Sequence, residues 1–126
     1  MPRFSFPKSV RLLKSAEFER VFQQRCSAAD GLLVVHSAFG TSTQPRLGIV
    51  VSRRCGNAVL RNRWKRCLRE AFRLAQNDLP RRLDLVVLPR RGAKPDVVRL
   101  QSSLQKLASI NASKLSPPCD ASGENL

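Results

Sequence analysis

The stretch that decides the fold covers residues 53–73 and reads RRCGNAVLRNRWKRCLREAFR. It contains eight Lys or Arg residues and a single acid, Glu70. Its apolar residues recur at the 3.6-residue period of an α-helix and therefore share one side. These residues are Leu60, Trp64, Cys67, Leu68, Ala71 and Ala75. The pattern predicts an amphipathic helix that buries this side and presents a rigid row of cations to solvent.

We expect this helix to begin at Gly56 and Asn57. Gly relieves the turn, and the Asn side chain can accept a hydrogen bond from a free backbone N–H as the N-cap. Basic residues then recur at every fourth position, with no acid among them: Arg61, Lys65, Arg69 and Arg73. Like charges at this spacing repel by roughly 0.2–0.5 kcal/mol per pair. An ordinary solvated helix face mixes signs, so the row favours a surface for a polyanion such as nucleic acid.

The composition of the whole chain indicates the same kind of partner. Among 126 residues, 23 are basic and 9 are acidic, which gives a net charge of +14. Such a charge indicates a nucleic acid or an anionic membrane. No apolar run approaches the roughly 18 residues of a membrane span, and no signal peptide opens the chain. We therefore expect one cytoplasmic domain with no membrane association.

Chemistry carried by this chain alone is not visible in the sequence. The four cysteines, Cys26, Cys55, Cys67 and Cys119, form no C-x-x-C motif, and His36 is the single histidine. A zinc site or a disulfide framework is therefore not expected. The nine acids are scattered and form no D-x-D cluster that would hold Mg²⁺. We assign no catalytic residue and no metal ligand to the protein.

Around the basic helix, the sequence predicts the order helix, strand, strand, helix, strand, helix. The strands are expected at residues 32–39, 46–52 and 83–88. One flanking helix is expected at residues 97–110, and the other is a short helix that Ser15 can cap and that carries Phe18, Val21 and Phe22. This order predicts one small α+β domain, in which helices pack on a sheet of three to four strands.

The domain is expected to cover residues 1–112, and the polar residues 113–126 are expected to form a disordered tail.

The first helix leaves two interpretations open. Phe18, Val21 and Phe22 share one face because they stand at i, i+3 and i+4. They could pack as ordinary core residues. Alternatively, part of this aromatic face could line a groove in which a nucleic-acid base stacks.

The sequence also resembles a known family. The run GNAVLRNRWKRCLREAFR closely resembles the signature helix of the bacterial ribonuclease P protein component, with its R-N-R core at Arg61-Asn62-Arg63. Residues 47–54 and 84–87 resemble the family's strands before and after that helix. Arg11-Leu12, Glu17-Phe18 and Val21-Phe22 resemble its opening helix. The likeness covers residues 9–110.

The resemblance implies a fold and a function. The family fold is a small α/β sandwich with a left-handed crossover around the basic helix. The family protein is the small subunit of a ribonucleoprotein that removes the 5′ leader of precursor tRNA in tRNA maturation. Its large RNA performs the Mg²⁺-dependent hydrolysis, so the protein alone would bind no cofactor. The implied partners are the catalytic RNA and precursor tRNA, with no obligate protein partner.

The resemblance also implies two binding surfaces. The first would face the catalytic RNA and comprises Arg53, Arg54, Asn57, Arg61, Asn62, Arg63, Lys65, Arg66, Arg69 and Arg73. The second, which we call the leader groove, would take the single-stranded leader and comprises Arg11, Lys14, Phe18, Phe22 and His36. The family usually has an aromatic residue where this chain has His36, and an imidazole stacks more weakly.

Three other functions fit parts of the sequence. A different RNA-binding protein, such as a ribosomal protein or an RNA chaperone, would explain the charge but not the R-N-R helix. A DNA-binding regulator would place the basic helix in a major groove, but a strand before that helix argues against a helix-turn-helix. An autonomous nuclease would need an active site that the sequence does not reveal.

Overall fold

The computed structural model describes residues 15–40, 44–90 and 92–115. The elements in chain order are α1 (Ser15–Gln23), β1 (Ser27–Ala29), β2 (Leu33–Phe39), β3 (Arg46–Ile49), the 3₁₀ turn η2 (Arg53–Cys55), α2 (Ala58–Ala75), the 3₁₀ turn η3 (Gln76–Asp78), β4 (Leu83–Pro89) and α3 (Val97–Lys114). The predicted class, a small α+β fold with three helices and a sheet of three to four strands, is confirmed.

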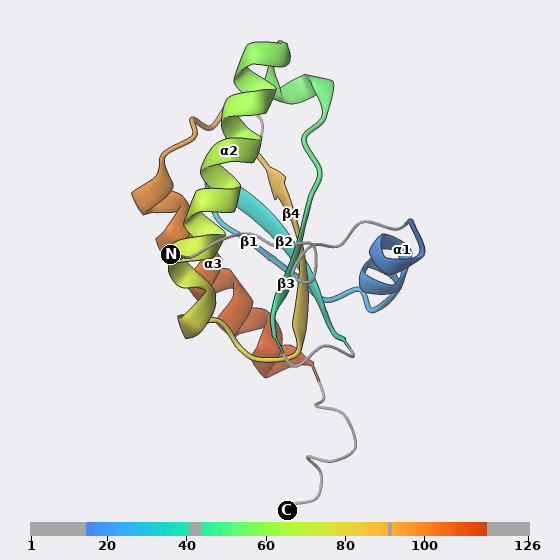
Figure 1. Ribbon diagram of the computed structural model, residues 1–126. Coiled ribbons are helices and arrows are strands. Elements are labelled where there is room, and N and C mark those ends of the chain that lie inside the picture. The colour runs from blue at the N-terminus through green and yellow to red at the C-terminus, as the bar shows by residue number, and fades with distance from the viewer. Residues whose placement is uncertain (1–14, 41–43, 91, 116–126) are drawn as a thin grey trace, which may run out of the picture.

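The four strands form one mixed sheet in the order β1-β2-β4-β3. β4 pairs antiparallel with β2 and parallel with β3, so α2 connects two neighbouring parallel strands. Figure 1 shows α2 and α3 on one face of this sheet and α1 by itself on the other. The left hand expected for the crossover through α2 stays a prediction.

The two faces of the sheet are packed unequally. Alternate β4 residues Leu83, Leu85 and Val87 belong to a large core with α2 and α3, which includes the fully buried Trp64 and Phe72. On the α1 face, the buried cluster in the described part of the chain consists of Val21, Ala38 and Val86. Burial of a large apolar side chain contributes roughly 1.5–3 kcal/mol. Most of the hydrophobic stabilisation therefore lies between the sheet and the α2–α3 pair.

The start of α2 follows the prediction. The Asn57 side-chain oxygen accepts a hydrogen bond of 3.0 Å from the Leu60 N–H, so Asn57 is the N-cap. Gly56 has φ 129° and ψ −164°, a conformation that is essentially restricted to glycine. A Cβ atom at Gly56 would also lie 2.6 Å from the Leu60 side chain. Sequence and local geometry therefore agree on where this helix begins.

Several element boundaries differ from the predictions. The strand β1 was not predicted, because Ser27-Ala28-Ala29 contains none of the β-branched or aromatic residues that favour strands. β3 ends at Ile49 rather than at residue 52, because the chain turns into η2 shortly afterwards. On α2, Phe72 is fully buried although the predicted apolar side did not include it. It follows Leu68 by four positions and so widens that side.

The second long helix extends beyond its predicted end at residue 110. Ile110, expected on the apolar side, is 42% exposed, whereas the next residue, Asn111, is fully buried. The Asn111 amide nitrogen donates to the Val35 carbonyl oxygen at 2.9 Å and to the Ser37 hydroxyl at 2.8 Å. A polar residue therefore anchors the last turns of α3, which apolar periodicity could not show. The division into a domain and a tail stays a prediction, since residues 116–126 lie outside the described part.

Candidate nucleic-acid interface

The basic residues of α2 and η2 form one surface, which we call the cationic face. Trp64, Leu68 and Ala71 are buried under α2, so the helix is held firmly against the core. The predicted residues Arg53, Arg54, Asn62, Arg63, Arg66 and Arg69 are exposed, and Arg61 and Lys65 are half-buried. Within the described part of the chain, no carboxylate forms an ion pair with any of these eight residues. The positive charges of the seven Lys and Arg residues among them are therefore available to a polyanion.

Arg73 is an exception in the predicted row of cations. Its Nε atom donates to Glu70 Oε1 at 3.0 Å, and a second ion-pair contact joins Arg73 Nη2 to Glu70 Oε2. The hydrogen bond from Arg73 lowers the pKa of Glu70, and the same bond raises the pKa of Arg73. Arg73 is therefore paired, although no acid occupies the four-residue spacing of the row. Its partner Glu70 stands three positions before it.

Two further predicted residues have particular surroundings. The Asn57 side-chain oxygen is already used by the helix cap, so this residue has a structural role in the described fold. The Nε atom of Arg61 is buried, and no described group accepts a hydrogen bond from it. Arg61 is thus a half-buried member of the cationic face and is less exposed than Arg63 or Arg66.

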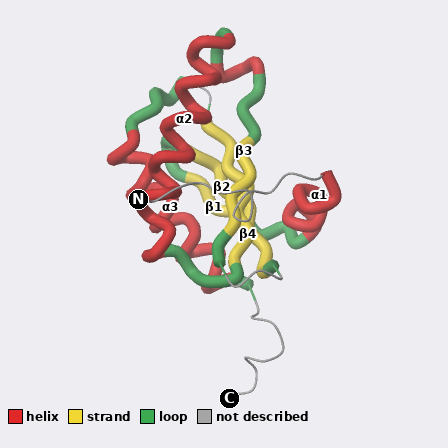
Figure 2. The backbone as a smooth tube through the Cα atoms, viewed as in Figure 1, coloured by secondary structure: helices red, strands yellow, loops and turns green. Residues whose placement is uncertain are grey.

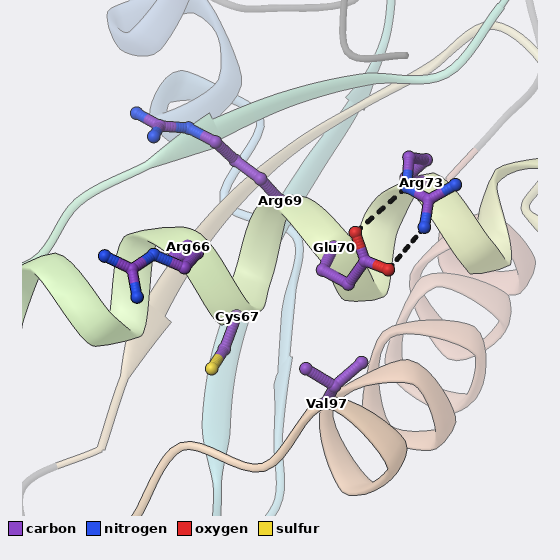
Figure 3. A pocket seen from close by; sticks show the side chains of 6 residues that line it. All are labelled: Arg66, Cys67, Arg69, Glu70, Arg73 and Val97. Atoms are coloured by element: carbon purple, nitrogen blue, oxygen red, sulfur yellow. Dashed lines mark hydrogen bonds and ion pairs between the residues drawn. The ribbon is translucent and has the colours of Figure 1, made fainter. Parts of the chain in front are cut away.

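A surface cavity of about 370 Å³ lies between α2 and the start of α3. It is lined by Arg66, Cys67, Arg69, Glu70, Arg73 and Val97. In Figure 3, the Glu70–Arg73 pair lies at one end, while Arg66 and Arg69 extend along α2 away from that pair. Cys67 and Val97 reach into the space between the two helices. The cationic face therefore includes a shallow hollow with an apolar floor.

The described residues that were predicted to form the leader groove lie on α1 and β2, on the face of the sheet opposite α2 (Figure 1). The rings of Phe22 and His36 stand 4.8 Å apart between centroids at an interplanar angle of 69°, an edge-to-face contact. Phe22 is 38% exposed, so part of its ring is open to solvent. Burial lowers the pKa of His36, which favours a neutral imidazole at pH 7. The structure thus brings Phe22 and His36 together, and their role toward RNA stays a prediction.

The other predicted members of the leader groove differ in their placement. Phe18 is half-buried and packs against the small cluster of Val21, Ala38 and Val86, as a core residue does. Arg11 and Lys14 lie outside the described residues.

An ionic cluster near the leader groove was not predicted. It consists of Glu17 and Arg20 from α1, Arg46 from β3 and Asp84 from β4. Asp84 is fully buried, and Arg46 binds both of its carboxylate oxygens, at 2.9 Å from Nε and 2.8 Å from Nη2. Its hydrogen bond with Asp84 raises the pKa of Arg46. The available signal was the single acid in the otherwise apolar run LDLVVL of residues 83–88.

A second carboxylate ties the turn before β2 to α3. Asp30 Oδ1 accepts hydrogen bonds from the Leu32 and Leu33 N–H groups at 2.8 and 2.9 Å. Its Oδ2 accepts the Ser103 hydroxyl at 2.7 Å and lies 3.6 Å from the Lys106 ammonium. Burial alone would raise the pKa of Asp30, but these hydrogen bonds and Lys106 outweigh it, so the pKa lies below its ordinary value.

The described residues offer no group of three or more His, Cys, Asp or Glu side chains that could hold a metal ion. Cys26, Cys55 and Cys67 are free thiols, and Cys119 lies outside the described part. None of the described helices is long and apolar enough to cross a membrane.

Comparison with known proteins decides the family. The ribonuclease P protein family matches residues 6–111 of this chain. The chain belongs to the bacterial ribonuclease P protein family. The ribonuclease P protein component of Brevibacillus brevis is 44% identical over 104 residues, which cover 82% of this chain and 81% of that protein. This ribonuclease P protein is therefore a component of an endoribonuclease holoenzyme and acts in the maturation of tRNA 5′ ends, which confirms the resemblance found in the sequence.

Solved structures agree with this assignment. The ribonuclease P protein of Staphylococcus aureus superposes with a TM-score of 0.69 at 35% identity, over 82% of this chain and 95% of that one. A mutant of the S. aureus protein, described as defective in mRNA degradation activity, gives a TM-score of 0.70 at 35% identity and covers 82% of this chain and 88% of that one. Membership of the family implies association with the ribonuclease P RNA.

Proposed function

We propose that the cationic face binds the phosphate backbone of the catalytic RNA. The observation that carries this proposal is the set of exposed guanidinium groups on α2, including Arg63, Arg66 and Arg69, which no described carboxylate neutralises. A guanidinium group can bind a phosphate through two parallel hydrogen bonds. Because α2 is anchored by its buried side, these groups are held in place before the RNA arrives. We include Arg53 and Arg54 of η2 in the same surface.

We further propose that the leader groove binds the 5′ leader of precursor tRNA. The exposed part of Phe22 beside His36 offers a surface on which an unpaired base can stack. Such stacking is worth roughly 1–3 kcal/mol per base and tolerates any base sequence. Arg11 and Lys14 would add phosphate contacts at the edge of the groove. The two RNA partners would then be held on opposite faces of one sheet.

In this proposal the hydrolytic chemistry belongs to the RNA subunit. The described residues supply no cluster that fits a resident catalytic metal, so we derive no catalytic step on the protein and place the required Mg²⁺ on the RNA. The protein's part is to bind and orient the two RNAs. The cellular site would be the bacterial cytoplasm, where precursor tRNA is made.

The salt dependence of binding to the catalytic RNA tests the cationic face. Each phosphate contact should add roughly 0.7–0.9 to the slope of log affinity against log salt. Arg63→Ala should reduce the slope by about this amount. Arg81→Ala removes the same charge from an exposed turn outside α2 and should leave the slope nearly unchanged. Equal effects of both variants, or affinity that does not vary with salt, would contradict the proposal.

Reconstitution tests the division of labour between protein and RNA. The purified protein alone should not cleave precursor tRNA. Added to its cognate RNA, it should lower the Mg²⁺ concentration needed for cleavage and favour substrates that keep a leader. A mutant of the S. aureus protein is described as defective in mRNA degradation activity. For this reason mRNA should be included as a second substrate. Metal-dependent cleavage by RNA-free protein would instead support an autonomous nuclease.

A further inference from the structure

The position of α1 on the sheet depends on few apolar contacts. In the described part of the chain, the apolar cluster between α1 and the sheet has three buried members, Val21, Ala38 and Val86, and three partly buried neighbours, Phe18, Val50 and Leu88. Of the described helices, α1 alone lies on this side of the sheet (Figure 1). So small a cluster provides little resistance to sliding or rotation of the helix. Another interaction is needed to fix where α1 lies.

The ionic cluster connects α1 to the sheet at two points. Arg20 of α1 forms an ion pair with Asp84 of β4 and donates from Nη1 to the Phe39 carbonyl oxygen of β2 at 3.0 Å. Glu17 of α1 accepts a hydrogen bond of 3.1 Å from Arg46 of β3. Glu17 and Arg20 stand three positions apart and so lie on the same side of α1. Together they restrict rotation of the helix about its axis and its displacement relative to the sheet.

Asp84 is the centre of this arrangement. Its carboxylate is fully buried and interacts with both Arg20 and Arg46. The backbone next to it leaves room for the carboxylate, since a Cβ atom on Gly40 would lie 2.7 Å from the Asp84 carboxyl carbon. A buried carboxylate without partners is strongly unfavourable. The two guanidinium groups must therefore stay at this point of the sheet, and Arg20 brings α1 with it.

The same helix carries one wall of the leader groove. Phe22 follows Arg20 by two residues on α1, whereas His36 belongs to β2. Their separation of 4.8 Å is consequently set by where α1 rests on the sheet. A small displacement of α1 would change how the Phe22 ring lies against His36, and with it the surface open to a base, without altering either residue.

We propose that Asp84 is a positioning residue for leader binding: through Arg20 it fixes α1 on the sheet and thereby sets how Phe22 lies against His36 in the leader groove. Asp84 is buried and does not touch RNA itself. This inference rests on the proposed function of the leader groove. A competing role exists for Arg20, whose side chain is 37% exposed and could contact a leader phosphate directly. The two roles predict opposite effects of removing the Asp84 charge.

The test uses the reconstituted holoenzyme and two substrates, precursor tRNA and the same tRNA without its leader. The leader gain is the ratio of the affinities for the two. Asp84→Asn should reduce the leader gain by up to about tenfold, the effect of losing one stacked base. Asp30→Asn is the matched control, because it makes the same chemical change in another hydrogen-bonded carboxylate, whose side-chain partners Ser103 and Lys106 lie on α3. It should leave the leader gain unchanged. Affinity for the catalytic RNA should not change in either variant.

A combination of variants separates positioning from simple destabilisation. Phe22→Ala should itself reduce the leader gain, and Asp84→Asn added to Phe22→Ala should cause little further loss, since both act on one groove. Arg20→Lys keeps the charge but lacks the planar fork that reaches Phe39 and Asp84, and it should behave like Asp84→Asn. This second variant serves if Asp84→Asn does not fold.

Each contrary outcome has a separate meaning. If Phe22→Ala leaves the leader gain intact, the proposed leader groove is wrong and this inference falls with it. If Phe22→Ala reduces the gain but neither Asp84→Asn nor Arg20→Lys does, the groove stands and the positioning role is overturned. If Asp84→Asn raises the gain, the freed Arg20 binds the leader directly, which also overturns the positioning role.

Discussion

Phe18 and Phe22 lie one turn apart on α1, yet their surroundings differ. Phe18 packs against a buried cluster, whereas Phe22 is 38% exposed. Full truncation of a buried Phe costs roughly 3–5 kcal/mol, so Phe18→Ala, at a half-buried site, should lower the free energy of unfolding by up to about 3 kcal/mol. Phe22→Ala should lower it by less than about 1 kcal/mol and weaken leader binding instead. Urea unfolding and leader affinity should be measured for both variants. If Phe18 were the stacking residue, Phe18→Ala would cause the larger loss of leader affinity and Phe22→Ala the smaller one.

Asp30 provides a prediction about pH. Its pKa in the folded protein is lower than the ordinary value of 3.8, so the carboxylate is favoured by folding. This stabilisation is present above the ordinary pKa and is lost as the pH falls through the pKa of the folded state. Between pH 6 and pH 3, the free energy of unfolding should therefore fall more steeply for the wild type than for Asp30→Asn. Parallel curves would show that Asp30 does not contribute to acid sensitivity.

At the scale of the element, α2 offers a matched pair of asparagines. Asn57 caps the helix through Leu60, whereas Asn62 is exposed within it. Asn57→Ala should destabilise the protein by about 0.5–2 kcal/mol, the usual cost of losing an N-cap. Asn62→Ala should be neutral or slightly stabilising, because Ala has the higher helix propensity. Thermal or urea unfolding of the two variants checks this, and a larger loss for Asn62→Ala would contradict the capping role.

The elements also show what the sequence could and could not reveal. α2 was predictable because its apolar period, its glycine and its cap are all local features. β1 was not, since three small residues become a strand only through pairing with β2. The end of α3 depends on Asn111, whose partners Val35 and Ser37 are 76 and 74 residues away.

The same limit applies to the candidate site. The exposed cations of α2 could be predicted, because one helix carries them at a regular spacing. The ionic cluster could not, because Arg46 and Asp84 are separated by 38 residues and Arg20 and Asp84 by 64. Such partners meet only when strands and helices from distant segments pack together. Phe22 and His36 were assigned to one groove from family resemblance, and their ring contact is visible only in the fold.

At the scale of the whole molecule, the two proposed RNA surfaces lie on opposite faces of the sheet, as the separation of α1 from α2 in Figure 2 shows. Effects at distant sites without shared partners usually add within about 0.3–0.5 kcal/mol. Arg63→Ala should weaken binding of the catalytic RNA and leave the leader gain unchanged, and Phe22→Ala should do the reverse. The double variant should combine both losses. A coupling clearly larger than that range would show that the two surfaces communicate through the sheet.

The unequal packing of the two sheet faces has a consequence for motion. Regions with little buried apolar surface open at a lower free-energy cost than the core they rest on. The backbone amides of α1 should therefore exchange their hydrogens during brief detachment of that helix. Those of β4 should exchange only when the whole protein unfolds. The protein would then combine a rigid core with one more loosely attached helix, whose detachment must also break the ion pairs to Asp84 and Arg46.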